Sequence, residues 1–441
     1  MKTRRDFLQA ASLAATAAYI GTPGMAQFSF AQLAGETRLF IKAFMRGGAD
    51  GLHLFPPYGD PFYYLYRPDI ALEGPNQGES QAALDMGSDY RAMNPNLWPL
   101  MEIWEDNRLL VSPATHYDRN NRSHFDSQRW IGTGTNNNLI DGYLNRYMQV
   151  QPVDDEHPIR GATLGQSNRS REMSGAIGTP SINRQSDFNI RNNDFCSGSG
   201  CAENRLLELM SENALHPTNL SEAEGTLKES QLLMVETIEE VQGLASYMPN
   251  AAARELADDY SGQGAGRGLK LIAQLVKGNI PLEVAAINVD GSWDSHSDQI
   301  SMDDSAPFTD QNYRYNSRMH VGARDLAMFY RDMQDYMDRI VVLVCTEFGR
   351  TVKQNGSVGT DHGHAGAWYA FGGGIQGGFA PDVATISEET LDRGNFLPMQ
   401  VNYKDIVGEI MVKHLGLDED LVSTVFPEHS FTDYEFISAG A

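Results

Sequence analysis

The 441-residue sequence is poor in cysteine and in basic residues, and it has no low-complexity tract. Its 34 Lys and Arg face 58 Asp and Glu, which gives a formal charge of −24. A surface with this charge repels nucleic acid and anionic lipid at long range, so we expect no nucleic-acid partner. A site for an anionic substrate therefore needs positive charge of its own, from arginine side chains or metal ions.

Three cysteines leave room for one disulfide at most. Cys345 lies at the end of the apolar run 340–344 and is expected to be a buried, small hydrophobic side chain. Cys196 and Cys201 enclose the sequence Ser-Gly-Ser-Gly and could pair in an oxidising compartment. A metal site made from these two alone lacks ligands, so the disulfide is the favoured interpretation.

The N-terminal segment lacks an apolar run long enough to be a membrane anchor. The stretch 10–20 is too short and too rich in alanine for a span. Arg4 and Arg5, followed by Asp-Phe-Leu, instead match a twin-arginine signature, and 24–26 offers small residues for cleavage. We therefore predict a signal peptide at 1–26, export by the twin-arginine machinery, a periplasmic or secreted protein, and no membrane span after signal removal.

Apolar runs and helical periodicity alternate along the rest of the chain. Strand-like runs occur at 38–45, 108–114, 282–289, 340–346 and 368–371. Helical patterns occur at 97–106, 139–150, 221–244, 251–256, 269–276, 318–337 and 405–415. Near-continuous apolar strands separated by helices indicate an α/β fold with a mostly parallel sheet covered on both faces. The chain is long enough for one large α/β domain or two smaller ones, and residues from about 165 to 203 are expected to form long loops or an insertion.

Acidic residues and histidine gather after the predicted strand 282–289. The segment 290–298 holds three carboxylates and a histidine, including Asp294 and His296. Divalent ions prefer carboxylate oxygen, and zinc also accepts imidazole, so this loop is a candidate metal site. The alternative is a polar loop whose aspartates cap the next helix. The neighbouring Trp293 and the histidine favour the functional interpretation.

Two further segments carry the same residue types. Asp361, His362 and His364 surround a glycine and can hold a metal or donate to an oxyanion. Glu347 and Arg350 follow the strand 340–346. A glutamate at that position is either a metal ligand or the ion-pair partner of the arginine, and the sequence favours neither.

A polar segment, 116–126, follows the predicted strand 108–114. A helix that starts near Ser123 would direct backbone N–H groups and a hydroxyl toward the strand ends, with Arg119 and Arg122 nearby. That arrangement suits an anion pocket and a nucleophile. Ordinary helix capping by Ser123 explains the same pattern, so both interpretations stay open.

Five ordered segments resemble the DUF1501 family: GGADGL at 47–52, RSHF at 122–125, GSWDSH at 291–296, EFGRT at 347–351 and GTDHGH at 359–364. The resemblance runs from about residue 36 to about residue 430. The family is uncharacterised in function and is regarded as a distant relative of the alkaline phosphatase and sulfatase superfamily. The resemblance implies that residues 27–441 form a single domain, an alkaline-phosphatase-like three-layer α/β/α sandwich with a loop-rich insertion around 165–203. It also implies a two-metal site at the strand ends.

The resemblance also implies roles for individual residues. Asp50 matches a metal ligand after the first strand, and Ser123 loosely matches the nucleophile. Glu347 and Phe348 stand where the superfamily has Asp-His, so one histidine is missing there. The expected metal ligands are Asp50, Asp294, His296, Glu347, Asp361 and His364. The expected catalytic residues are Ser123, His124, Arg122 and His362.

Two functions of different classes fit these expectations. The first is an exported metal-dependent hydrolase of phosphate or sulfate esters, in which divalent zinc, calcium, magnesium or manganese polarises the ester. The second is a non-catalytic, metal-binding protein with a binding or assembly role. Phe348 in place of histidine favours the second. In either case the strand-end residues, Asp50 and His364 among them, are expected at one edge of a single sheet.

Overall fold

The computed structural model describes residues 37–75, 82–151, 159–187, 241, 243–244, 246–289, 291, 293–301 and 305–438. The expected signal peptide, Cys196 and Cys201, and most of the helix expected at 221–244 lie outside these residues. In the part of the chain that is described, no helix is long and apolar enough to cross a membrane.

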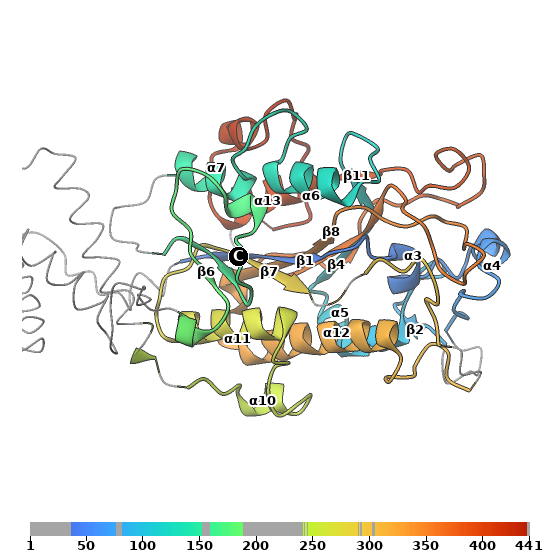
Figure 1. Ribbon diagram of the computed structural model, residues 1–441, viewed down its shortest axis with the longest axis horizontal. Helices are drawn as coiled ribbons and strands as arrows, with labels where there is room; N and C mark the ends of the chain where they lie inside the picture. The colour runs from blue at the N-terminus through green and yellow to red at the C-terminus, as the bar shows by residue number, and fades with distance from the viewer. Residues whose placement is uncertain are drawn as a thin grey trace, which may run out of the picture.

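A nine-stranded sheet runs through the middle of the molecule (Figure 1). The strand order is β10-β4-β9-β8-β1-β7-β5-β6, and β11 pairs with β4. The strands are β1 (Leu39–Met45), β4 (Leu109–His116), β5 (Gly161–Leu164), β6 (Ser181–Ile182), β7 (Val284–Val289), β8 (Ile340–Thr346), β9 (Gly366–Gly372), β10 (Gly378–Phe379) and β11 (Val401–Asn402). All pairings are parallel except those of β9, which is antiparallel to both β4 and β8. A separate two-stranded sheet joins β2 (Leu84–Asp85) and β3 (Ala92–Met93).

Helices cover both faces of the large sheet (Figure 1). One layer contains η1 (Pro95–Leu100), α5 (Met101–Glu105), α10 (Ala251–Arg254), α11 (Gly264–Lys277) and α12 (Arg314–Asp332). The opposite layer contains α6 (His124–Thr133), α7 (Tyr143–Val150), α13 (Tyr403–Glu409) and α14 (Val422–Val425). Two short helices, α3 (Gly51–Leu54) and α4 (Pro61–Tyr66), lie beyond the strand ends. The structure therefore confirms the expected three-layer α/β/α sandwich with a mostly parallel sheet.

Strand β1 shows why the central strands are apolar throughout. It pairs with β7 on one side and β8 on the other, so both of its faces are covered by helices. Ile41, Ala43 and Met45 pack in the core that includes α11 and α12. Phe40 and Phe44 pack in the core that includes α7 and α13. Cys345 is fully buried in the second core and free, as expected, and burial raises the pKa of its thiol to about 12.

Several element boundaries differ from the sequence-based predictions. The helix predicted at 97–106 is a 3₁₀ turn followed by α5, because Pro95 and Pro99 fit a first helical turn but not a helix interior. Helix α12 begins four residues earlier than predicted and ends at Asp332, where η4 (Gln334–Arg339) follows. Strand β5 was not predicted. The region expected to be loops contains η2 (Arg171–Met173), β6 and η3 (Gln185–Asp187). The last helical stretch continues from α13 into η5 (Ile410–His414), and η6 (Glu419–Leu421) precedes α14.

The carboxyl ends of β1, β4, β7 and β8 lie at the same edge of the sheet, together with the amino end of β9. The loops at this edge follow β1, β4, β7 and β8 or precede β9. The structure thus brings Asp50, Ser123, Asp294, Glu347 and His364 to one edge, because each lies in one of these loops or caps the helix that follows it.

Candidate functional site

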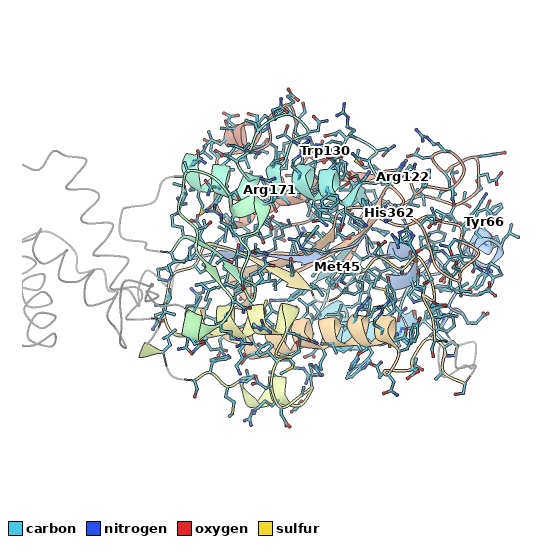
Figure 2. All side chains as sticks on the ribbon, viewed as in Figure 1. Met45, Tyr66, Arg122, Trp130, Arg171 and His362 are labelled. Atoms are coloured by element: carbon cyan, nitrogen blue, oxygen red, sulfur yellow. The ribbon has the colours of Figure 1, made fainter. Side chains whose placement is uncertain are left out.

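Three histidines surround the carboxylate of Asp294 at this edge. His124 Nε2 lies 3.5 Å from Asp294 Oδ2. His296 Nε2 and His362 Nε2 each lie 3.1 Å from Asp294 Oδ1, and they are 3.1 Å from each other. We call His124, Asp294, His296 and His362 the histidine cluster. His362 lies beside Arg122, beyond the end of the sheet (Figure 2).

The second ring nitrogen of each histidine faces an oxygen atom. His124 Nδ1 lies 2.8 Å from Glu347 Oε1. His296 Nδ1 lies 2.8 Å from Asp361 Oδ1, and His362 Nδ1 lies 2.8 Å from the backbone oxygen of Arg122. An Nδ1–H that donates to such an acceptor fixes the tautomer of a neutral imidazole and leaves a lone pair on Nε2. All three rings therefore present Nε2 toward Asp294.

Local structure holds these side chains in place. His124 is the first residue of α6, whose N-cap is Ser123, and Ser123 Oγ accepts the Asp126 amide at 3.5 Å. Trp293 is buried next to Asp294, and its amide donates to the Arg46 carbonyl at 2.9 Å. Gly47 has a φ of +123°, and a Cβ there would lie 2.6 Å from the amide nitrogen of Asp294. Glycine is thus required for the loop after β7 to approach β1 so closely.

Glu347 is completely buried behind His124. It accepts the Gly47 amide at 2.9 Å and the Gln128 side-chain amide at 2.8 Å. Burial raises the pKa of Glu347, but the hydrogen bonds from His124 and Gln128 outweigh it and hold the pKa below its ordinary value. The hydrogen bond to Glu347 raises the pKa of His124 in turn. The negative charge of Glu347 is therefore held against the imidazole of His124.

Arg350 pairs with Asp294 and not with Glu347. Its Nη1 donates to Asp294 Oδ1 at 2.8 Å, and its side chain is completely buried. Burial raises the pKa of Asp294, but the charge of Arg350 outweighs it and lowers the pKa below its ordinary value. Phe348 packs against His124 and His362, with ring centroids 4.9 Å from each. Phe348 thus helps to position two imidazoles.

Asp50 belongs to a different, closed network. Arg67 binds both of its oxygens, at 2.7 Å and 3.1 Å. Gln299 donates to Oδ2 at 2.6 Å, and the Leu52 amide donates to Oδ1 at 3.2 Å as the cap of α3. Burial raises the pKa of Asp50, but the charge of Arg67 outweighs it and lowers the pKa. Four donors already occupy this carboxylate, although the sequence suggested a metal ligand.

His364 also turns to other partners. Its Nδ1 lies 3.1 Å from Asp392 Oδ2, and its ring lies against Phe396 with centroids 4.5 Å apart. Burial lowers the pKa of His364. The Arg122 guanidinium lies 4.8 Å from the centre of the Phe396 ring. Arg122 therefore contacts the histidine cluster through its backbone carbonyl, whereas its charged group packs on Phe396.

The structure therefore brings together some of the expected metal ligands and some of the expected catalytic residues. Of the expected metal ligands, Asp294, His296, Glu347 and Asp361 join the expected catalytic residues His124 and His362 in one network. Sequence reasoning missed Gln128, Arg67 and Gln299. Only Gln128 left a signal, because it follows His124 by four residues and so lies on the same face of α6.

One subset of the histidine cluster has the spacing of a metal site. Ligand atoms of His124, Asp294 and His362 all lie within 4.8 Å of one another. The 3.1 Å and 3.5 Å contacts to Asp294 resemble neighbouring zinc ligands, because Zn–N bonds of 2.0–2.1 Å give tetrahedral edges of about 3.3–3.4 Å. This donor set therefore fits a divalent cation.

Comparisons with known proteins place the chain in context. Residues 107–420 match the family "Protein of unknown function (DUF1501)". A comparison with curated proteins found no match. Among solved structures, a protein in the alkaline phosphatase superfamily from Vibrio parahaemolyticus aligns with 11% identity and a TM-score of 0.31, over 79% of this chain and 63% of that one. The lipoteichoic acid synthase LtaP from Listeria monocytogenes aligns with 11% identity and a TM-score of 0.36, over 90% and 76%. The chain thus spans less than two thirds of the Vibrio protein.

Proposed function

The chain belongs to the DUF1501 family, and we propose that it is a metal-dependent ester hydrolase whose metal ligands are His124, Asp294 and His362. One observation carries the proposal. Glu347 and the Arg122 carbonyl occupy the Nδ1 atoms of the two histidines, so both Nε2 atoms face Asp294 as donors. Oxygen acceptors behind metal-binding histidines are a general feature of such sites.

The donor set narrows the choice of metal. Two imidazoles and one carboxylate suit zinc, and manganese less well, whereas calcium and magnesium prefer oxygen donors. Three protein ligands leave a coordination position open, as in catalytic zinc sites. A cation held there would supply Lewis-acid chemistry to an ester oxygen. The sulfate and phosphate esters implied by the family resemblance are the substrate class that we propose.

We assign proton transfer to His296. Its side chain is 47% exposed, whereas that of His362 is 22% exposed, so His296 faces an incoming substrate more openly. Asp361 holds its Nδ1, which leaves Nε2 directed toward Asp294. A histidine oriented by a carboxylate in this way can take a proton from an attacking water and return it to the leaving group. The sequence had suggested His296 and Asp361 as ligands, so this assignment changes their role.

The attacking group in this proposal is water. Ser123, the nucleophile suggested by the resemblance, uses its hydroxyl to cap α6. The proposal retains the expected export by the twin-arginine route, so the esters would be met in the periplasm or outside the cell. The predicted signal at 1–26 lies outside the described residues.

The test separates metal binding from turnover. Full-length mature protein is loaded with zinc, and its metal content and its turnover of 4-nitrophenyl phosphate and 4-nitrophenyl sulfate are measured. We expect Asp294→Asn and His362→Gln to lose the metal and the turnover together. His296→Gln is the matched control, because it should keep the metal and lose most of the turnover. Wild-type protein that binds no zinc or manganese would overturn the proposal.

A non-catalytic metal-binding protein is the second candidate. The buried ion pair between Arg350 and Asp294 favours it, because ion pairs of this kind often serve structure and not catalysis. In that case the zinc-loaded protein would bind metal through His124, Asp294 and His362 without turning over either ester. His296→Gln would then change nothing that these assays measure.

A further inference from the structure

A basic cavity of about 290 Å³ lies next to the histidine cluster. Five cationic side chains and one carboxylate line it, which is unusual in a chain whose formal charge is −24. We call the cavity the arginine pocket. These charged residues are Lys42, Arg46, Arg129, Arg169, Arg171 and Glu172.

Three segments far apart in the sequence build the pocket. Lys42 lies on the face of β1 that turns toward α6, the face of Phe40 and Phe44, since side chains two residues apart share a face of a strand, and Arg46 follows β1 directly. Arg129 comes from α6 itself. Arg169 and Arg171 come from the segment that enters η2, and Arg171 lies on the same side of the sheet as Trp130 of α6 (Figure 2).

Most of the positive charge in the pocket is not neutralised by acids. Lys42 pairs with Glu172 at 2.9 Å, and both side chains are almost fully buried at 3% and 6% exposure. Arg46 donates to the neutral side chains of Asn288 and Gln128. Within the described part of the chain, no ion pair joins Arg46, Arg129, Arg169 or Arg171 to a carboxylate. Four guanidinium groups around one cavity attract an oxyanion, because each can donate two parallel hydrogen bonds to it.

A short hydrogen-bond chain connects the pocket to the histidine cluster. Arg46 Nη1 donates to Gln128 Oε1 at 2.7 Å, and Gln128 Nε2 donates to Glu347 Oε1 at 2.8 Å. Glu347 in turn contacts His124. His124 and Gln128 are one helical turn apart on α6, so the two sites share this helix as a wall. Phe125, the residue after His124, lines the pocket, and 90% of its surface is exposed.

We propose that the arginine pocket binds a second anionic group of the substrate, so that the substrate is an ester carrying a further phosphate, sulfate or carboxylate. The assignment of the ester to the histidine cluster rests on the proposed function, but the anion site itself does not. A cavity of about 290 Å³ is near the lower limit of small-molecule pockets, about 300 Å³, and suits one oxyanion with the ring or chain that carries it. Exposed Phe125 is placed to contact that ring or chain.

The first experiment measures anion binding alone. Inorganic phosphate and inorganic sulfate are titrated calorimetrically, at low salt, into full-length mature protein treated with a chelator. The test variant carries Arg169→Gln and Arg171→Gln, two exposed positions whose replacement leaves the core intact. Arg254→Gln, exposed on α10 in the opposite layer, is the control for the loss of a surface arginine away from the pocket. We expect at least tenfold weaker binding in the double variant and no change in the control.

The second experiment locates the anion on the substrate. Zinc-loaded protein is assayed with 4-nitrophenyl phosphate and with a nitrophenyl phosphate that carries an additional ring carboxylate. We expect the double variant to raise KM about tenfold for the ester that carries the ring carboxylate, with kcat unchanged. The KM for 4-nitrophenyl phosphate should stay the same. A free anion site would instead show anion binding that depends on Arg169 and Arg171 without any KM difference between the two esters, which would overturn the substrate assignment.

The outcomes separate the two proposals. If the double variant and the control bind phosphate and sulfate as tightly as the wild type does, the arginine pocket is not an anion site. This result would overturn the second proposal even if zinc binding and turnover are present. Anion binding that requires Arg169 and Arg171, in a protein that binds no metal, would overturn the proposed function and leave the arginine pocket standing.

Discussion

Asp50 and Asp294 lie at the same edge of the sheet, and each has an arginine partner, yet their surroundings differ. Asp50 is 1% exposed and accepts hydrogen bonds from Arg67, Gln299 and the Leu52 amide. Asp294 is 29% exposed, and three imidazoles approach it in addition to Arg350. A carboxylate whose donors all come from fixed protein groups serves the fold. A carboxylate that faces several lone pairs needs a proton or a cation to offset them.

The comparison also explains why one sequence pattern gives two outcomes. Both aspartates follow a parallel strand by a few residues, which is where open α/β sheets place ligands. The difference comes from distant residues. Arg67 reaches Asp50 from the end of α4, and His362 reaches Asp294 from the loop before β9. We therefore expect replacement of Asp50 to lower the stability of the metal-free protein most, and replacement of Asp294 to act mainly on metal binding.

The largest effect should come from Asp50. Asp50→Asn leaves the completely buried guanidinium of Arg67 without a counter-charge. Removing one partner of a buried ion pair costs about 3–5 kcal/mol of folding free energy. Denaturant unfolding of the metal-free protein should therefore show a loss of this size.

A surface pair provides the control for Asp50. Asp338 pairs with Arg108 at 3.0 Å, but its side chain is 73% exposed. Asp338→Asn should cost less than about 1 kcal/mol, because water screens such pairs. Equal losses for the two variants would contradict the division between a closed and an open carboxylate.

The effect of Asp50 should also depend on pH in a defined direction. Burial raises the pKa of Asp50, but Arg67 outweighs it, so the folded-state pKa lies below the ordinary value of 3.8. A depressed carboxyl pKa contributes stability above the unfolded-state pKa and loses it as pH falls through the folded-state pKa. The gap in unfolding free energy between wild type and Asp50→Asn should stay constant near neutral pH and shrink below 3.8. A gap that grows on acidification would show that the sign is wrong.

At Asp294 the loss of stability should be larger when metal is present. Zinc at about 100 times its dissociation constant should stabilise the wild type by about 2.7 kcal/mol, because it binds the folded state alone. Asp294→Asn should remove this metal-dependent stabilisation and change the metal-free protein less than Asp50→Asn does. Unfolding with and without a chelator measures both numbers. A zinc-dependent gain of the same size in the variant would exclude Asp294 as a ligand.

The sequence predicted the parts of the fold that depend on local pattern. Strands β7 and β8 are apolar because both of their faces are buried, and such runs are readable in a sequence. Strand β5 has four residues, two of them Gly161 and Thr163, and so leaves no such signal. The direction of β9 was also hidden, because its apolar run fits a parallel or an antiparallel neighbour equally.

For the site, the sequence predicted which loops take part but not how their charged residues pair. The acidic and histidine-rich loops could be located, because they follow or precede strands at one edge. The sequence did not predict which carboxylate pairs with which cation, since Arg350 stands as close to Glu347 in the chain as an ion pair requires, yet it pairs with Asp294. The arginine pocket was hidden for the same reason: Lys42 and Arg169 are more than a hundred residues apart and meet only in the folded chain.

A smaller effect, on zinc affinity, is expected from Glu347, which holds His124 Nδ1. Glu347→Gln keeps the shape of the side chain, but its amide can donate to His124 Nδ1, which moves the ring proton to Nε2 and removes the donor lone pair. Partners of this kind typically contribute 10–100-fold to metal affinity, so zinc should bind about 10–100-fold more weakly. Competition with a chelating dye measures the affinity. Unchanged affinity would mean that His124 is not a ligand.

The smallest effect should come from Asp361, because water can replace it. Its side chain is 58% exposed and holds His296 Nδ1 at 2.8 Å. Asp361→Asn should lower turnover about tenfold or less, at the lower end of the effect of such outer partners, and should leave zinc content unchanged. The pH profile of kcat separates this role from a structural one, since only a partner of the proton-transferring imidazole shifts the profile. Loss of zinc in Asp361→Asn would instead return His296 and Asp361 to the metal centre, as the sequence first suggested.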